Sequence, residues 1–481
     1  MLVSFSEQSQ ISEVMAVANG SLSSVDIKNL EERLDSFDRV VRTEALKELA
    51  RRINSGEVNV PESKNEVNLH FHTFFSFNAY NWSPSRVAWE AKKYGLIAAG
   101  IVDFDVLDGM EEFLEAGEII GLRTTAAMET RVLIPEYADK VLSSPNEPGI
   151  GYFMACGCVR KPAEGTKSAR TLALMRDMAK RRNLQVIERV NDYLDKVRLS
   201  YDEDVLPLTP SGNATERHML AAYDARARKV FEGDQSALSD FWAKALEIDL
   251  GEAEQLLQNT PAFHEKMRAK LMKFSGVGYV APSAETFPDV YLVTEVIQGM
   301  GALPALAWLD GTNPGESDMP ALLGLLASRG TAAMNIIPDR NWNIKNADEK
   351  RIKLDNLDKA VKAAKELNLP LCVGTELNKL GLPFVDNFSA PELQPYIADF
   401  LEGAFFFWGH TFLDRNAGIG WASDWANAHF GADRAKHNAF YAKVGRLADP
   451  ASAKERIAGK DLASASPDEV IKVVEGRILN F

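Results

Sequence analysis

Apolar and polar residues alternate strictly along one early stretch of the chain. Every second residue from Val67 to Phe71 is apolar, whereas Asn68, His70 and His72 are polar. A period of two predicts a strand that presents both imidazoles on one face. Neutral imidazole is the commonest metal ligand in proteins, and this spacing lets both rings reach one ion. Alternatively, the two histidines are hydrogen-bonded neighbours at a strand end, and the stretch alone leaves both interpretations open.

Apolar runs typical of buried strands then alternate with helical patterns. We expect further strands at 96–102, 124–128, 303–309, 331–337 and 370–373. Helices with a 3.6-residue period lie between them, which predicts βαβ units and a parallel sheet in an α/β fold. Polar residues follow the ends of these strands, where parallel α/β folds place their active sites.

Three segments outside this alternation are predicted to be helical. Residues 1–64 form an N-terminal helical cap, in which Ile27, Leu30, Leu34 and Phe37 make one apolar stripe. Helices at 170–193, 215–230, 240–257 and 261–274 form an inserted subdomain, 151–280, that serves as a lid or as a homo-oligomer interface. Residues 389–481 form a C-terminal helical extension. The barrel-like part is then 65–150 and 281–388.

Charge and cysteine content narrow the classes of partner. The chain has 54 Lys and Arg against 68 Asp and Glu, a net charge of −14, which argues against a nucleic-acid surface. A small anionic substrate held by a few local cations is compatible with this charge. Three cysteines are too few for a disulfide framework or a structural zinc site. No run of 18 apolar residues and no basic segment leading into an apolar core occurs, so we expect a cytoplasmic protein with no membrane partner.

Potential metal ligands follow several of the predicted strands. They are His70, His72, Asp103, Glu129 and Glu376. Two imidazoles and carboxylates that converge at one end of a barrel suit Zn²⁺, Mn²⁺ or Fe²⁺. Taken singly, each carboxylate is equally compatible with a helix cap or a solvated loop. Convergence on one edge of the sheet favours the metal site.

The same residues resemble a known family. The segments 70–76 (HFHTFFS), 102–105 (VDFD) and 128–129 (ME) are similar to the H-x-H-T-x-x-S, T-D-H and G-x-E motifs of the PHP domain, the polymerase and histidinol phosphatase family. Residues 303–308 resemble the strand that ends in Ala-His-Pro, and 369–378 the closing G-S-D-A-H strand. The similarity covers roughly 66–135 and 284–388. It implies a distorted (βα)7 TIM-like barrel, metal-dependent phosphoesterase chemistry and up to three metal ions.

The chain departs from the family pattern at four histidine positions. Phe104, Trp308, Asn378 and Asn78 stand where family members have imidazoles. The resemblance leaves His70, His72 and Glu129 as metal ligands, and it places Glu376 where the family has Asp. Since Phe and Trp cannot coordinate, we expect one divalent metal ion, Zn, Mn or Fe, rather than two or three.

With a single ion, side chains must stabilise the charge of the transition state. Arg131, Arg340 and Lys379 follow strand ends and could donate to an anion, although each could equally be a surface cation. Asp103 is a candidate general base, or it orients a histidine. His218 of the insert is expected to be an exposed helical residue, with a position above the site as the alternative.

Together these expectations describe a metal-dependent hydrolase acting on a small phosphate ester, with Asp103, Arg131 and Arg340 as catalytic candidates. Two alternatives stay open. One is a metal-assisted reaction on a carbonyl, sugar or amide substrate. The other is a PHP-fold binding module that has lost turnover.

Overall fold

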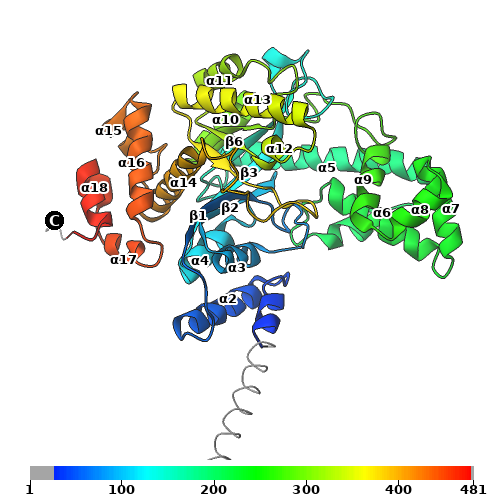
Figure 1. Cartoon of the computed structure of the whole chain (residues 1–481), viewed down its shortest axis with the longest axis horizontal. Helices are drawn as coiled ribbons and strands as arrows, with labels where there is room; N and C mark the ends of the chain where they lie inside the picture. The colour runs from blue at the N-terminus through cyan, green and yellow to red at the C-terminus, as the bar shows by residue number, and fades with distance from the viewer. Residues whose placement is uncertain (1–25, 478–481) are drawn as a thin grey trace, which may run out of the picture.

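A seven-stranded sheet curls around the centre of the molecule (Figure 1). The computed structural model describes residues 26–477. The strands follow one another in the order of the sequence. They are β1 (Lys64–Phe71), β2 (Leu96–Phe104), β3 (Arg123–Leu133), β4 (Ile150–Cys156), β5 (Leu303–Trp308), β6 (Ala333–Ile336) and β7 (Leu371–Val373). The predicted α/β barrel is confirmed.

Strand direction departs from a simple βα repeat at one place. β1, β2 and β3 are mutually parallel, as are β5, β6 and β7. β4 is antiparallel to both of its neighbours. It returns directly from β3, with only the short 3₁₀ turn Pro135–Tyr137 between the two strands, so no helix intervenes. The barrel is therefore distorted at β4, a strand whose residues after Ile150 fall in the range 151–280 that was expected to belong to the insert.

The barrel closes between β7 and β1. Phe71 pairs with Glu376 in a parallel bridge just beyond β7. The backbone N–H of His72 donates to the carbonyl of Glu376 at 2.8 Å, and the N–H of Glu376 donates to the carbonyl of His70 at 2.8 Å. Gly374 makes this approach feasible, because a Cβ there would lie 2.6 Å from the backbone nitrogen of His70. Barrel closure and the histidine strand therefore share the same residues.

Helices surround the barrel and share its hydrophobic core. They are α3 (Pro84–Tyr94), α4 (Met110–Ile120), α10 (Val290–Gly299), α11 (Met319–Ser328), α12 (Asp339–Trp342), α13 (Ala347–Glu366) and α14 (Ile397–Ala417). The bounds of α3 follow from its residues: the Ser83 side chain accepts from the N–H of Arg86, Pro84 starts the helix, and Gly95 ends it at φ 88°.

The helix α14 packs against the starts of the strands. A side chain at Gly403 would collide with the carbonyl of Leu371, the first residue of β7. Arg123, the first residue of β3, lies over the ring of Phe405. Because α14 covers the amino ends of the strands, their carboxyl ends remain as the open mouth of the barrel.

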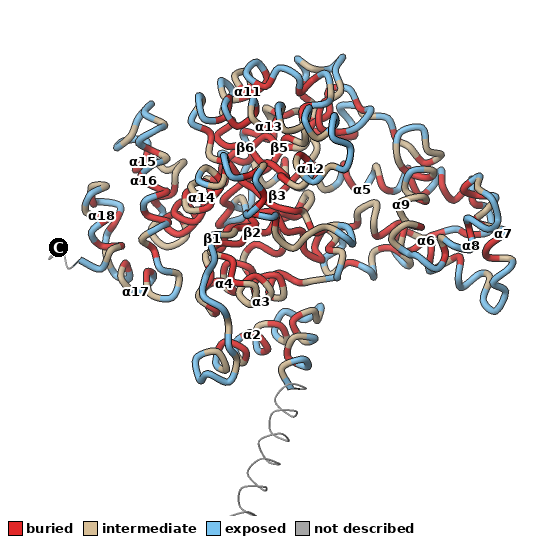
Figure 2. Tube along the Cα trace, in the orientation of Figure 1, coloured by how far each residue is buried: buried red, intermediate tan, exposed pale blue. Residues whose placement is uncertain are grey.

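The insert forms a helical body with a separate core, to the right in Figures 1 and 2. Its helices are α5 (Lys167–Leu194), α6 (Glu216–Val230), α7 (Gln235–Leu246), α8 (Leu250–Leu257) and α9 (Thr260–Leu271). The single helix expected at 240–257 is two helices, because Glu247 adopts φ 55° and ends α7.

The chain ends add helices at the periphery. α2 (Arg39–Asn54) follows a short helical segment in which Leu30 and Leu34 are buried. Phe37 was expected in the same stripe, but it is 48% exposed. The tail contains α15 (Asp424–Phe430), α16 (Arg434–Leu447), α17 (Ala453–Ile457) and α18 (Pro467–Val474). Positions 1–25 of the predicted cap lie outside the described residues. Between residues 26 and 477, no helix combines the length and apolarity needed to cross a membrane.

Candidate metal centre

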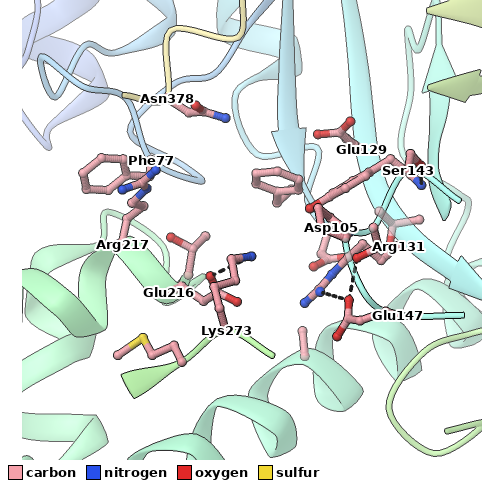
Figure 3. A pocket seen from close by; sticks show the side chains of 18 of the residues that line it. Phe77, Asp105, Glu129, Arg131, Ser143, Glu147, Glu216, Arg217, Lys273 and Asn378 are labelled. Atoms are coloured by element: carbon pink, nitrogen blue, oxygen red, sulfur yellow. Dashed lines mark hydrogen bonds and ion pairs between the residues drawn. The ribbon is translucent and has the colours of Figure 1, made fainter. Parts of the chain in front are cut away.

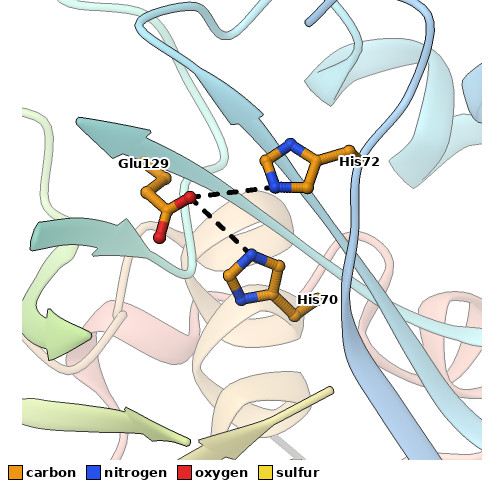
Figure 4. Close-up of side chains that lie close together, drawn as sticks. All are labelled: His70, His72 and Glu129. Carbon is orange, nitrogen blue, oxygen red and sulfur yellow. Dashed lines mark ion pairs between the residues drawn. The ribbon is translucent and has the colours of Figure 1, made fainter. Parts of the chain in front are cut away.

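Three buried side chains converge at the mouth of the barrel (Figure 4). His70 and His72 extend from the end of β1, and Glu129 from β3. Glu129 Oε2 lies 3.9 Å from Nε2 of His70 and 3.7 Å from Nε2 of His72. One ligand atom from each residue falls within 4.8 Å of the others. Within residues 26–477, no other trio of His, Cys, Asp or Glu side chains meets this geometry.

The two imidazoles are neutral and have unused nitrogen atoms. Burial lowers the pKa of His70 to about 4 and that of His72 well below its usual value. Both ring nitrogens of His70 and the Nε2 of His72 are buried without a hydrogen-bond partner. Burial, and then the charge of Glu376, raises the pKa of Glu129. Orphaned neutral nitrogens facing a carboxylate form a donor set that fits a divalent cation.

A chain of hydrogen bonds orients His72. Ser76 Oγ donates to Asp103 Oδ1 at 2.6 Å, and His72 Nδ1 lies 3.0 Å from the same hydroxyl. Because the hydroxyl proton is used on Asp103, Ser76 accepts from His72, so the imidazole proton sits on Nδ1. This tautomer leaves a lone pair on Nε2, the atom that faces Glu129.

Asp103 itself lies behind the cluster. Besides Ser76, it accepts from the N–H of Thr73 at 2.9 Å and from Thr73 Oγ1 at 2.7 Å. It is 2% exposed and does not line the cavity described below. Burial raises its pKa to about 6 despite these hydrogen bonds. Of its two predicted roles, general base or support for a histidine, the geometry fits the second.

Glu376 lies beside the cluster and is paired with Arg340. Arg340 Nη2 donates to Glu376 Oε2 at 2.9 Å, and both residues line the cavity. Glu376 was expected as a fourth ligand, but its carboxylate is outside the group of three that converges. Its backbone has φ 68°, the left-handed region that a residue other than glycine adopts at a cost. Such strain is common at functional sites, and here it accompanies barrel closure.

The side chains at the four positions where PHP-domain members have histidines make other contacts. The ring of Phe104 stacks on His72 at 4.6 Å. Asn78 donates to the carbonyl of His72 at 2.8 Å, and Asn378 lines the cavity. Trp308 is fully buried, and its neighbours Ala307 and Leu309 line the cavity instead. None of these four side chains offers a His, Cys, Asp or Glu ligand atom to the cluster, and the expected number of one ion stays a prediction.

A cavity of about 680 Å³ opens above the cluster, between the barrel and the insert (Figure 3). The barrel contributes Glu129, Arg131 and Tyr152 to its wall, and α5 and α9 contribute Arg182 and Arg268. The volume is in the range of pockets for whole small molecules. The insert therefore forms part of the wall of this cavity, and the lid predicted as one of its two roles stays a prediction.

The turn before α6 joins the insert to the barrel through side-chain hydrogen bonds. Asn213 Nδ2 donates to the carbonyls of Phe75 at 3.0 Å and Phe104 at 2.8 Å, both next to the histidine cluster. His218 follows at the start of α6. It is 5% exposed, its Nδ1 accepts from the N–H of Thr215, and its ring contacts Phe77. The expectation of an exposed His218 was wrong, because the helix turns this face towards the barrel.

Several charged residues pair with one another where the insert and the barrel meet around the cavity. Arg131 Nη1 donates to Glu147 at 3.1 Å, Arg268 donates to Glu216 at 2.9 Å, and Lys273 lies 3.5 Å from Glu216. Sequence reasoning identified Arg131 but missed the insert cations Arg182, Arg268 and Lys273. Arg182 and Arg268 lie on amphipathic helices and Lys273 follows the end of α9, where cations are usually exposed, so the sequence held no distinguishing signal.

Comparisons with known proteins give a limited likeness. A scan of protein-family models finds no match, and a search of curated proteins finds no relative. Among solved structures, an amidohydrolase from Chromobacterium violaceum with bound sulfate and no metal aligns with 69% of this chain and 96% of its own, at 14% identity and a TM-score of 0.45. A protein from Bifidobacterium adolescentis, provisionally described as a metal-dependent phosphoesterase, aligns with 71% and 98%, at 17% identity and a TM-score of 0.43. At these scores the argument about function rests on the chain's own residues, and the PHP resemblance stays a prediction.

Proposed function

We propose that the chain is a metal-dependent hydrolase that cleaves a small phosphate ester at the His70–His72–Glu129 cluster. The observation that carries this proposal is the set of orphaned imidazole nitrogens facing Glu129, the member of the cluster that lines the cavity. A structural histidine pair would use its nitrogens in hydrogen bonds, because leaving them buried and unsatisfied costs stability.

Each ligand has a defined part in holding the ion. Nε2 of His72 is presented by the Ser76–Asp103 chain, and His70 is fixed by the backbone bonds that close the barrel. Glu129 supplies the negative charge, and Glu376 is the next carboxylate in reach of the site. A divalent cation in such a site supplies Lewis acidity and lowers the pKa of water.

The substrate's charge would be met by residues of the cavity wall. Arg340 lies beside the cluster through its bond to Glu376, so its guanidinium can donate to a phosphoryl oxygen. Arg131 lies two residues beyond Glu129 on the same face of β3. A wall with several guanidinium groups favours an anionic ester over a neutral amide or sugar.

Exclusion of water is the contribution of the lid. Asn213 holds the turn before α6 against the barrel, and the apolar rings of Phe77 and Phe104 line the cavity near the cluster. Charges in such a water-poor site interact more strongly than in solution, which increases the effect of each donor.

The proposal is tested with a panel of phosphomonoesters assayed with Mn²⁺, Zn²⁺ or Fe²⁺. We expect turnover that His72→Ala abolishes and that His264→Ala, a change in the insert away from the cluster, preserves. Tight ligand binding without turnover of any ester would instead support a binding module. Turnover that survives in the His72→Ala protein would contradict the assigned site.

A further inference from the structure

Arg182, on α5, is a buried cation that forms no ion pair, although the charge of Asp105 acts on it from nearby. Its Nη1 donates to the carbonyl of Thr286 at 3.0 Å. Among the residues that the structure describes, it takes part in no ion pair, although it lines the cavity. Burial and the neighbouring charge of Arg131 lower the pKa of Arg182 to about 10. A desolvated guanidinium beside another cation is unfavourable unless an anion compensates it.

A second guanidinium lies next to it. The central guanidinium carbons of Arg131 and Arg182 are 4.5 Å and 4.7 Å from the centre of the Phe287 ring. Arg131 comes from β3 and Arg182 from α5, so the barrel and the insert together form this part of the cavity. We call the region around Arg131, Arg182 and Phe287 the corner of the cavity. Glu147 is engaged by Arg131 and by the hydroxyl of Ser144, and it forms no ion pair with Arg182.

The surrounding charges leave the corner short of anions. Four cations, Arg131, Arg182, Arg268 and Lys273, line this side of the cavity. The carboxylates around them are Glu147, Glu216 and Asp105; Glu265 also lines the cavity, but it is paired with a fifth cation, Arg217. Asp105 is also held by the hydroxyl of Thr130 at 2.6 Å. With four cations to three carboxylates, one further negative charge would balance the group.

The corner is separate from the metal cluster. Arg131 and Glu129 are two residues apart on β3, a rise of about 7 Å along the strand. Arg131 is the residue farther from the interior of the barrel and nearer to the lid. A ligand that spans both positions would place one end at the cluster and the other between barrel and lid.

We propose that Arg182, with Arg131 beside it, binds a second anionic group of the substrate, a carboxylate or a phosphate remote from the ester that is cleaved. This inference rests on the proposed function for the identity of the reacting end, but the anion site itself is independent of turnover. The substrate class is then a phosphate ester with a second anionic group, bound only when the lid is in place.

Binding of anions to the metal-free protein tests the site directly. Calorimetry with inorganic phosphate and with malonate is expected to show about one bound anion, and Arg182→Gln should weaken binding at least tenfold. Arg181→Gln is the matched control: this neighbour on α5 has the same charge but is exposed and pairs with Asp177 at 3.2 Å. His72→Ala should leave anion binding unchanged, because the corner is distinct from the cluster.

Two further measurements distinguish loss of the anion site from loss of folding. Arg182→Lys keeps the charge and loses the planar fork, so it should weaken binding by a smaller factor than Arg182→Gln. In crystals of the wild-type protein soaked with tungstate, the strongest anomalous peak should lie beside Arg182. Wild-type affinity in Arg182→Gln, no binding of either anion by the wild type, or tungstate at other positions only would each overturn the proposal.

Turnover distinguishes failure of this inference from failure of the proposed function. With metal present, Arg182→Gln should lower kcat/KM for 4-carboxyphenyl phosphate to about the value for phenyl phosphate and lower kcat/KM for phenyl phosphate by a much smaller factor. Equal losses on both esters would contradict a distal site. If the wild type cleaves neither ester but binds phosphate in an Arg182-dependent manner, the anion site stands and the proposed hydrolase activity falls.

Discussion

Gly374 lies against His70 so closely that the barrel can close only because position 374 lacks a side chain. A Cβ there would be 2.6 Å from the backbone nitrogen of His70 and would also meet its Cβ and the Asn68 side chain. The hydrogen bonds of Glu376 to His70 and His72 depend on this approach. The same contact that closes the fold therefore sets the positions of two ligands.

Gly374→Ala should separate β7 from β1. We expect a loss of about 2 kcal/mol in the free energy of unfolding, as for other overpacked sites, together with weaker metal binding. Urea denaturation and metal titration measure the two effects. Gly324→Ala is the control, since a Cβ at this position in α11 meets nothing within 4 Å and should be neutral or stabilising. Equal behaviour of the two variants would show that the approach at Gly374 is not limiting.

Asp103→Asn should act on the metal through His72. An amide cannot accept from all three donors that Asp103 serves, so Ser76 becomes free to donate to His72 Nδ1 and to move the imidazole proton to Nε2. Metal affinity is expected to fall about 10- to 100-fold, as for other partners of ligating histidines. The ¹⁵N shifts of the His72 ring report the tautomer. An unchanged tautomer together with unchanged affinity would refute the positioning role.

Asn213→Ala should loosen the lid. Its removal leaves the carbonyls of Phe75 and Phe104 without their donor, at a cost of about 1–2 kcal/mol. We expect faster hydrogen exchange in the insert and a higher KM, with metal binding retained. Ser236→Ala, at an exposed position of α7 in the insert, is the control. Exchange rates in Asn213→Ala equal to those of the wild type would mean that other contacts hold the lid.

Glu316 makes stability depend on pH. Burial, and then the charge of Asp310, raises the pKa of Glu316 to about 7, and its Oε2 has no hydrogen-bond partner. A raised carboxyl pKa means that the folded state binds the proton more tightly, so stability is lost as the pH rises from about 4.5 through about 7. Glu316→Gln should therefore be more stable than the wild type at pH 8, by up to about 3 kcal/mol, and should lose this advantage at pH 4.

The exposed Glu285 provides the comparison for that measurement. Glu285→Gln should follow the wild-type pH profile throughout. A Glu316→Gln protein whose advantage is the same at pH 4 and pH 8 would show that packing, rather than ionisation, distinguishes the variant.

Much of the barrel was predictable because its signals are local. Strand alternation revealed His70 and His72, and continuous apolar runs located β2, β3, β5, β6 and β7. β4 was missed because its segment, Ile150–Cys156, has no helix before it and no partner signal in the sequence. Antiparallel pairing with β3 and β5 is a tertiary property, which periodicity cannot show.

The site could be predicted from the sequence only to the extent that its residues follow the ends of predicted strands. Glu129 follows a strand and converges with the histidines, whereas Glu376 follows a strand and pairs with Arg340 instead. Whether the Glu376 carboxylate joins the histidines or pairs with Arg340 depends on its backbone conformation, with φ 68°. No sequence pattern predicts this conformation. Arg182 was missed because its place in the cavity depends on how the insert packs over the barrel, which the sequence does not show.

The central claim is a single cation held by His70, His72 and Glu129. Crystals of the protein loaded with Mn²⁺ or Zn²⁺ should give one anomalous peak within bonding distance of the Nε2 atom of His72, of a ring nitrogen of His70 and of a carboxylate oxygen of Glu129, at about one equivalent per chain. Two or three peaks in the barrel mouth, or a loaded protein with no peak between these three residues, would contradict the account.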